Sequence, residues 1–299
     1  MCMFSMMNHA RLAVGHQGVA VGERSYQQAL DYASQRVQGA VQGVEGRAPI
    51  IHHPDVKRML LQMRALTEAG RAMSFATMAA EDRATHHPQP EVRARNTLRV
   101  EVMTPLVKGW CTEMAMETTS LGVQVHGGMG FIEETGAAQH MRDARILPIY
   151  EGTNGIQALD FIGRKCLRDQ GEGIKQLLAD MSQAIEANQT EPSKSLIAGL
   201  HIALNQCQSA LEHVLAHPQK AYFVAYQFMM LLGNSVAYWQ LAVLGCAAAE
   251  KIQAGDQDEF LKQKLATAQF YKTQILPRNQ AHLEAILADA EFIDNLKLN

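Results

Sequence analysis

Residues 146–157, ILPIYEGTNGIQ, hold the acidic side chain that says most about chemistry. Glu151 lies between a run of apolar residues and a Gly-Thr pair at which a helix can begin. A carboxylate held in a dry pocket at a helix start has a raised pKa and suits a general base. Acidic residues also flank helix N-termini because the helix dipole favours them there. Composition alone favours this flanking role over the catalytic one.

A second candidate site is QVHGGMGF, residues 124–131. Three glycines, Gly127, Gly128 and Gly130, stand in four positions directly after a predicted helix. Bare backbone there can approach a phosphate or an aromatic ring closely, and its amides can bind an anion. The sequence is not the GxGxxG of dinucleotide-binding folds, and no predicted strand precedes it. Taken alone, it slightly favours a helix C-cap followed by a turn.

Histidine and cysteine patterns do not indicate a metal centre. The histidine pairs at 52–53 and 86–87 come without HExxH or a comparable carboxylate spacing. The five cysteines are odd in number, widely spaced and never form a CxxC pair. We therefore expect neither a metal site nor a disulfide framework, and a reducing, cytoplasmic location.

The composition is that of a folded protein with a sizeable core. Of the 299 residues, 47% are hydrophobic and 19% are charged, which excludes disorder for most of the chain. The net charge of −3 comes without any block of lysine or arginine, so no nucleic-acid partner is expected. The N-terminus lacks the basic leader of a signal peptide, and the apolar stretch 235–250 is shorter than a membrane span of ~20 residues. No membrane association is expected.

The elements that must position these groups are helices, because apolar residues recur at three- and four-residue spacing in nearly every segment. In the first half, glycine and proline mark 39–49 as a loop and HHPQPE, residues 86–91, as a helix end. The predicted helices are 5–36, 54–86, 96–126 and 156–169.

The second half begins at DQGEG, residues 169–173, which is the candidate domain boundary. Amphipathic segments at 174–188, 193–216, 218–253 and 257–290 then predict an antiparallel bundle of about four helices. The predicted fold is therefore all-α, with a four-helix up-down bundle in 1–168 followed by a second helical bundle in 169–299.

Two blocks of this sequence resemble the acyl-CoA dehydrogenase family of flavoenzymes. They are NHARLAVGHQG in the first helix and QVHGGMGFIEETGAAQHMRDARILPIYEGTNGIQ, and the resemblance runs from about residue 3 to 165. It implies that Glu151 removes the α-proton of an acyl-CoA thioester while FAD accepts a hydride from the β-carbon. Such a site must stabilise the enolate by hydrogen bonds to the carbonyl oxygen, and it must exclude water.

The resemblance also implies cofactor contacts. Arg36 matches an arginine that contacts the FAD pyrophosphate, and a guanidinium is well shaped for that role. Gln124, Gly127 and Gly128 match a QxxGG segment that meets the adenosine part of FAD, in the family from a neighbouring subunit. Thr153 matches a threonine that also touches FAD.

For the substrate and partners, the resemblance implies contacts of Arg11 and Gly152 with the acyl-CoA. It implies an electron-transfer flavoprotein or similar acceptor, and a homodimer or homotetramer that forms through the helix near 99–126.

Some positions depart from the family pattern. Val37 and Gln38 replace a usual Thr-Phe pair, and an inserted loop follows them. Pro54 and Gly155 stand where glutamines that contact the cofactor are common. We expect the flavin contact to be altered there.

The chain resembles the C-terminal half of a longer family member. Residues after about 171 resemble an additional helical domain of a long-chain subgroup that includes the methylmercaptopropionyl-CoA dehydrogenases. Without the N-terminal and middle domains of the family, we expect weak flavin binding and negligible activity for the chain alone. Two alternatives remain open: a branch that protects DNA after alkylation damage, and a non-catalytic assembly module.

Overall fold

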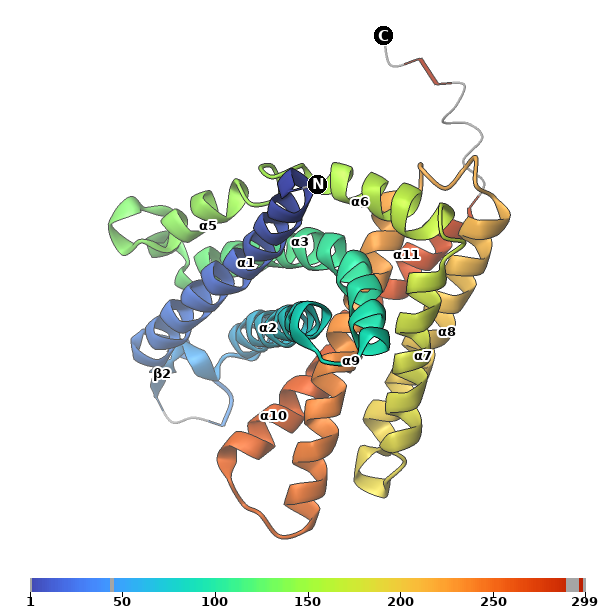
Figure 1. Ribbon diagram of the computed structural model, residues 1–299. Helices are drawn as coiled ribbons and strands as arrows, with labels where there is room; N and C mark the ends of the chain where they lie inside the picture. The colour runs from blue at the N-terminus through green and yellow to red at the C-terminus, as the bar shows by residue number, and fades with distance from the viewer. Residues whose placement is uncertain (1, 44–45, 289–295, 298–299) are drawn as a thin grey trace.

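The computed structural model describes residues 2–43, 46–288 and 296–297, which are built almost entirely from helices (Figure 1). The all-α prediction is confirmed. The main helices are α1 (Cys2–Gln35), α2 (Pro54–His86), α3 (Pro90–His126), α5 (Ala137–Arg145), α6 (Asn154–Ile162), α7 (Glu172–Ala187), α8 (Lys194–Ala216), α9 (Ala225–Gln253), α10 (Glu259–Phe270) and α11 (Arg278–Leu287). The short elements are β1 (Val37–Ala40), β2 (Arg47–Pro49), η1 (Ile50–His52), α4 (Gly128–Phe131), η2 (Glu133–Thr135), η3 (Gly163–Leu167), η4 (Glu191–Ser193) and η5 (Tyr271–Ile275).

The first half is a bundle of α1, α2 and α3, which α5 completes by packing on both α1 and α3. The close approach of α1 to α3 depends on small residues. A Cβ atom at Gly15 or Gly18 would lie 2.7 Å from the backbone carbonyl oxygen of Val107 or Cys111, respectively. Glycine therefore lets these two backbones pack directly against each other.

The second half contributes its central helix, α9, to the same hydrophobic core. Trp110 of α3 packs against Gly233, and its indole Nε1 donates a hydrogen bond to Asn234 Oδ1 at 2.6 Å. Arg278 of α11 donates two hydrogen bonds of 2.7 Å to the carboxylate of Glu117 on α3. One continuous buried cluster therefore crosses residue 169. The division into domains 1–168 and 169–299 stays a prediction.

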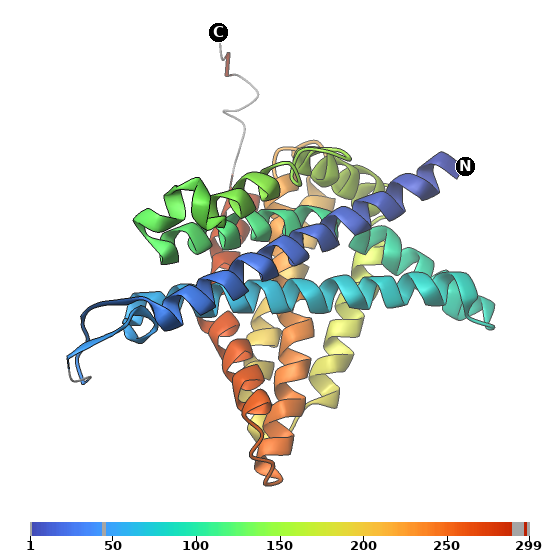
Figure 2. The ribbon, with the colours of Figure 1, turned by 90° about the vertical axis from the view of Figure 1, so that its left-hand side faces the viewer.

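Figure 2 shows α1 and α2 crossing in front of the helices of the second half, which run steeply across them. Helix α9 is long and apolar enough to cross a membrane by length and composition, but 78% of its most apolar window is buried inside the protein. It is therefore a core helix, as expected for 235–250.

The loop prediction for 39–49 is wrong, because this segment forms part of a hairpin. Strands β1 and β2 pair antiparallel, with Val37 opposite Pro49 and Ala40 opposite Arg47. Gly43 and Gly46, with φ of 84° and 79°, supply the left-handed backbone that the connection needs. The hairpin is missed in the sequence because glycine and proline mask so short a strand signal.

Other predicted boundaries also shift. Helix α3 begins before residue 96, since Pro90 fills a first-turn position whose N–H needs no partner. Residues 217–224 form turns, so α9 starts later than 218. The segment 257–290 divides into α10, η5 and α11 around Pro277, and residues 289–290 lie outside the described part.

Cys111, Cys166, Cys207 and Cys246 are free and buried, and the side chain of Cys2 lies outside the described residues. Burial raises the pKa of the Cys166 and Cys207 thiols to about 12. These thiols are therefore protonated core residues. No group of three or more potential metal ligands is found within the described ranges.

Candidate active site

The loop between α5 and α6 makes a sharp turn at Glu151. The N–H groups of Ile149 and Tyr150 donate to the Ile146 carbonyl at 3.0 Å, and Asn154 N donates to Pro148 O at 2.9 Å. Glu151 and Gly152 then adopt φ of 57° and 88°. A left-handed glutamate costs free energy and persists only where its surroundings hold it.

Side chains from α1 and α6 hold this turn by its backbone. Arg11 Nε donates to the Glu151 carbonyl at 3.4 Å. Gln157 Nε2 lies 3.4 Å from the Glu151 carbonyl and 3.3 Å from that of Gly152. Thr153 is the N-cap of α6, since its Oγ1 accepts from Ile156 N at 3.3 Å. The turn is therefore fixed from two helices.

Beneath the turn lies a buried cation that the sequence analysis missed. Lys108 of α3 is fully buried, and its Nζ donates to Gly152 O at 2.8 Å and Asn154 Oδ1 at 2.9 Å. Burial lowers the pKa of Lys108 to about 8. The charge of Arg11 also lowers this pKa, whereas the carboxylates of Glu113 and Glu151 raise it. The available signal was a lone lysine within the apolar run VMTPLVKGWC.

Glu151 itself is half-buried. The dry pocket expected around its carboxylate is therefore not closed by the described residues alone. Its backbone N–H has no acceptor in the described part of the chain. The turn thus offers a free amide donor beside a partly accessible carboxylate.

A hollow of about 500 Å³ adjoins this turn and contains Arg11 in its wall. Asp160 of α6 lies between two cations, 3.9 Å from Arg11 Nη1 and 3.1 Å from Arg164 Nη1. Tyr222 reaches the hollow from the 217–224 turns. The second half of the chain therefore contributes to the surroundings of the turn, which local sequence patterns do not reveal.

The other predicted site residues cluster at the far end of α1. Arg36 lines a hollow of about 340 Å³ together with Tyr32 and His126, whose rings stack at 4.4 Å. Gly127 and Gly128 follow His126 directly, and a Cβ atom at either position would meet nothing within 4 Å. Gln124 is exposed one turn earlier in α3.

The predicted cofactor contacts therefore fall into two groups. Thr153 lies in the turn held by Arg11, whereas Arg36 and the glycine segment lie near the opposite end of α1. At 1.5 Å per residue the two arginines are about 37 Å apart along the helix axis. One copy of the chain does not bring these residues together.

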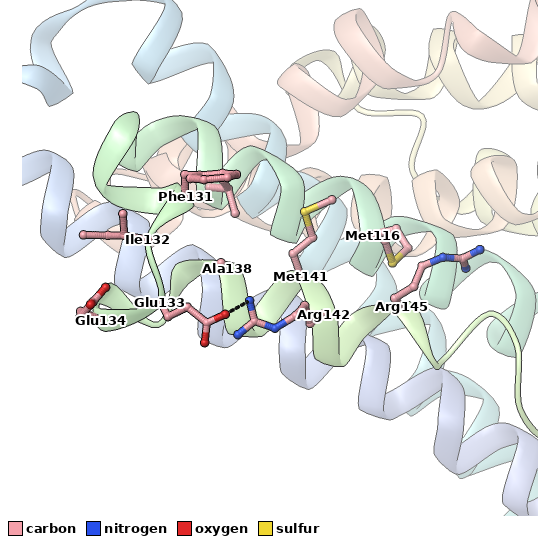
Figure 3. Close-up of a pocket in the computed structure, with 10 residues that line it drawn as sticks. Met116, Phe131, Ile132, Glu133, Glu134, Ala138, Met141, Arg142 and Arg145 are labelled. Carbon is pink, nitrogen blue, oxygen red and sulfur yellow. Dashed lines mark ion pairs between the residues drawn. The ribbon is translucent and has the colours of Figure 1, made fainter.

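Next to the glycine segment lies an apolar hollow of about 670 Å³ (Figure 3). Phe131, 82% exposed, Met141 and Met116 follow one another along it. An ion pair of 3.3 Å between Glu133 and Arg142 lies at its edge. Exposed apolar area of this kind is typical of an interaction face.

Comparison with known proteins decides the family. Residues 2–167, more than half of the chain, match the family profile described as the C-terminal domain of acyl-CoA dehydrogenases. This chain belongs to the acyl-CoA dehydrogenase family. Residues 177–295 match a second profile, described as acetyl-CoA dehydrogenase C-terminal like. The family resemblance and the additional C-terminal domain are thus confirmed.

Curated relatives support this assignment, and a solved structure shows the same fold. A 3-methylmercaptopropionyl-CoA dehydrogenase of Ruegeria pomeroyi is 50% identical over 92% of this chain and 48% of its own length. A broad-specificity linear acyl-CoA dehydrogenase of Mycobacterium tuberculosis is 31% identical over 98% of this chain and 51% of its own. The fold matches an acyl-CoA dehydrogenase of Bacillus anthracis solved with FAD, with a TM-score of 0.75, 21% identity and coverage of 98% and 51% of the two chains. The chain spans about half the length of these acyl-CoA dehydrogenases.

Proposed function

We propose that this chain supplies the catalytic base of an FAD-dependent acyl-CoA dehydrogenase, and that Glu151 is that base. The observation that carries the proposal is the Glu151–Gly152 turn, held by Arg11, Gln157 and Lys108 within the matched family region. Its carboxylate removes the α-proton of the acyl thioester. Bound FAD would supply the acceptor for the hydride that leaves the β-carbon.

The free N–H of Glu151 supports a role in binding the thioester carbonyl. An α-proton is too weakly acidic for a carboxylate unless negative charge on the carbonyl oxygen is stabilised by a donor. A backbone amide fixed by the same turn meets this need without reorganisation. Gly152 has a φ of 88°, which glycine adopts readily, so the chain can turn directly after the base. Arg11 fixes this turn from α1.

The residues at the far end of α1 fit part of FAD. The exposed Arg36 offers a guanidinium for the pyrophosphate, and Gly127 and Gly128 leave open space where a side chain would otherwise stand. Gln124 offers an amide beside them. Thr153 supplies a cofactor contact at the Glu151 turn, near the other end of α1.

We infer that residues of two copies of the chain would hold each FAD. A dinucleotide that touched both groups within one copy would have to extend along most of α1, and a second copy removes this requirement. The exposed apolar hollow at Phe131, beside the glycine segment, supports such an assembly. We propose a homodimer or homotetramer.

The electron acceptor and the location are further parts of the proposal. We propose an electron-transfer flavoprotein as the acceptor. The free buried thiols are compatible with a reducing, cytoplasmic location.

The experiment replaces Glu151 with Gln and measures acyl-CoA oxidation with FAD present. It is run on this chain alone and with the N-terminal half of the Ruegeria relative supplied in trans. Glu151→Gln keeps the shape but lacks a proton acceptor, so turnover should fall by roughly three orders of magnitude or more. Glu259→Gln, an exposed glutamate at the start of α10, is the matched control and should keep its activity. Near-normal turnover of Glu151→Gln would exclude this residue as the base.

A further inference from the structure

Lys108 is unusual among the charged residues of this chain. It lies in the middle of α3, and it is the only lysine or arginine of the described residues whose side chain is fully buried. Charged side chains are almost never fully buried unless they are paired, because removing them from water is costly. A lysine kept in such a place needs an explanation from its partners.

Those partners belong to the turn that carries Glu151. Lys108 Nζ donates to the Gly152 carbonyl at 2.8 Å and to Asn154 Oδ1 at 2.9 Å, so it binds the residues on either side of Thr153. Hydrogen bonds from an ionised donor are stronger than neutral ones. The charged groups that face this ammonium are Glu113 of α3, Arg11 of α1 and Glu151.

A polar chain continues from this cation into the second half. Asn154 Nδ2 donates to Glu113 Oε1 at 2.8 Å. Burial, together with the facing Glu113 carboxylate, raises the pKa of the Tyr226 hydroxyl of α9. Asn154 also donates to Gly109 O at 3.2 Å and lies 2.9 Å from the Thr112 hydroxyl oxygen. The base-bearing turn is therefore linked to α3 and, through α3, to α9.

We propose that Lys108 is a positioning residue for the base, holding the strained turn at residues 151–154 by its backbone and linking it through Asn154 and Glu113 to Tyr226 of the second half. This inference rests on the proposed function only where it treats Glu151 as the catalytic base. The anchoring itself concerns the chain alone and is measurable without cofactor or substrate.

Hydrogen exchange of the full chain tests the anchoring. Lys108→Met keeps the aliphatic volume and removes the donor. The Asn154 and Gln157 amides, which close the turn onto Pro148 O and Thr153 O, should exchange at least tenfold faster. Amides in α8 should be unchanged. Lys165→Met, which removes a 3.1 Å pair with Glu101 away from the turn, is the control and should leave the Asn154 and Gln157 amides as in the wild type.

Two outcomes would overturn the proposal. One is wild-type exchange at residues 154–157 in Lys108→Met. The other is a uniform acceleration through α3, α6 and α8 with a lower unfolding midpoint, which means that the lysine supports only the core. If Lys108→Met does not fold, the wild type decides by NMR. A slowly exchanging Nζ signal with a coupling across the hydrogen bond to the Gly152 carbonyl carbon supports the anchor, and a rapidly exchanging signal without that coupling contradicts it.

A kinetic readout separates this inference from the proposed function. In the assay with acyl-CoA and FAD, Lys108→Met should lower kcat at least tenfold with a smaller change in KM, because the base and the Glu151 N–H are misplaced while contacts with the rest of the acyl-CoA remain. Unchanged kcat per folded active site contradicts a positioning role. If Glu151→Gln retains full activity, the catalytic assignment fails while the exchange result at residues 154–157 stands.

Discussion

At the scale of single residues, the buried ammonium of Lys108 has a consequence for stability. Burial lowers its pKa from 10.5 to about 8. Between these values the unfolded chain binds more protons than the folded one, so the free energy of unfolding rises with pH from about 8 to 10.5. The penalty for burying the charge is full below pH 8 and is relieved above it. The gain by pH 9.5 should be on the order of 2 kcal/mol.

Urea unfolding at pH 7.5 and 9.5 measures this gain. Other groups titrate in the same range, so the comparison is between the wild type and Lys108→Met. The wild type should gain stability relative to the variant as pH rises, because the variant has no ammonium to bury. An equal pH dependence in both proteins would mean that Lys108 titrates as an ordinary exposed lysine.

At the scale of elements, the contact of α1 with α3 depends on glycine. A Cβ atom at Gly18 would lie 2.7 Å from the Cys111 carbonyl oxygen, which is helix backbone and has little freedom to move. Gly18→Ala should therefore destabilise the fold by about 1–3 kcal/mol in chemical unfolding. Gly128→Ala is the control, since its Cβ meets nothing within 4 Å, and it should unfold like the wild type. Equal stability of both variants would show that the helices separate at no cost.

At the scale of the whole molecule, the apolar hollow at Phe131 predicts self-association. Phe131 is 82% exposed and lies beside Met141 in the hollow wall. Phe131→Glu places a charge in that interface and should raise the dissociation constant at least tenfold in sedimentation velocity. Phe260→Glu, at a 60% exposed position in α10, is the control and should assemble normally. A wild-type chain that stays monomeric well above micromolar concentration is incompatible with this prediction.

Much of the helical framework follows from the sequence. Helix positions depend on local apolar spacing and on glycine and proline, which is why α1, α2 and α7 appear close to where they are predicted. The sequence also identifies the region around Glu151 as a candidate site, because a long contiguous block there carries the family resemblance. Turn-forming residues can also mislead. The glycines that predicted a loop at 39–49 instead connect the strands of a hairpin.

The tertiary structure alone decided which residues meet. Spacing shows which face of a helix is apolar, but it does not show which other face covers it. The pairing of Lys108 with Gly152 joins residues far apart in the chain, and the link from Asn154 through Glu113 to Tyr226 crosses between its halves. Arg36 is far from Thr153 because α1 is one unbroken helix, with Arg11 at the turn that contains Thr153 and Arg36 just after its other end. Such contacts depend on the packing of whole helices, because a buried polar group is stable only when distant partners satisfy it.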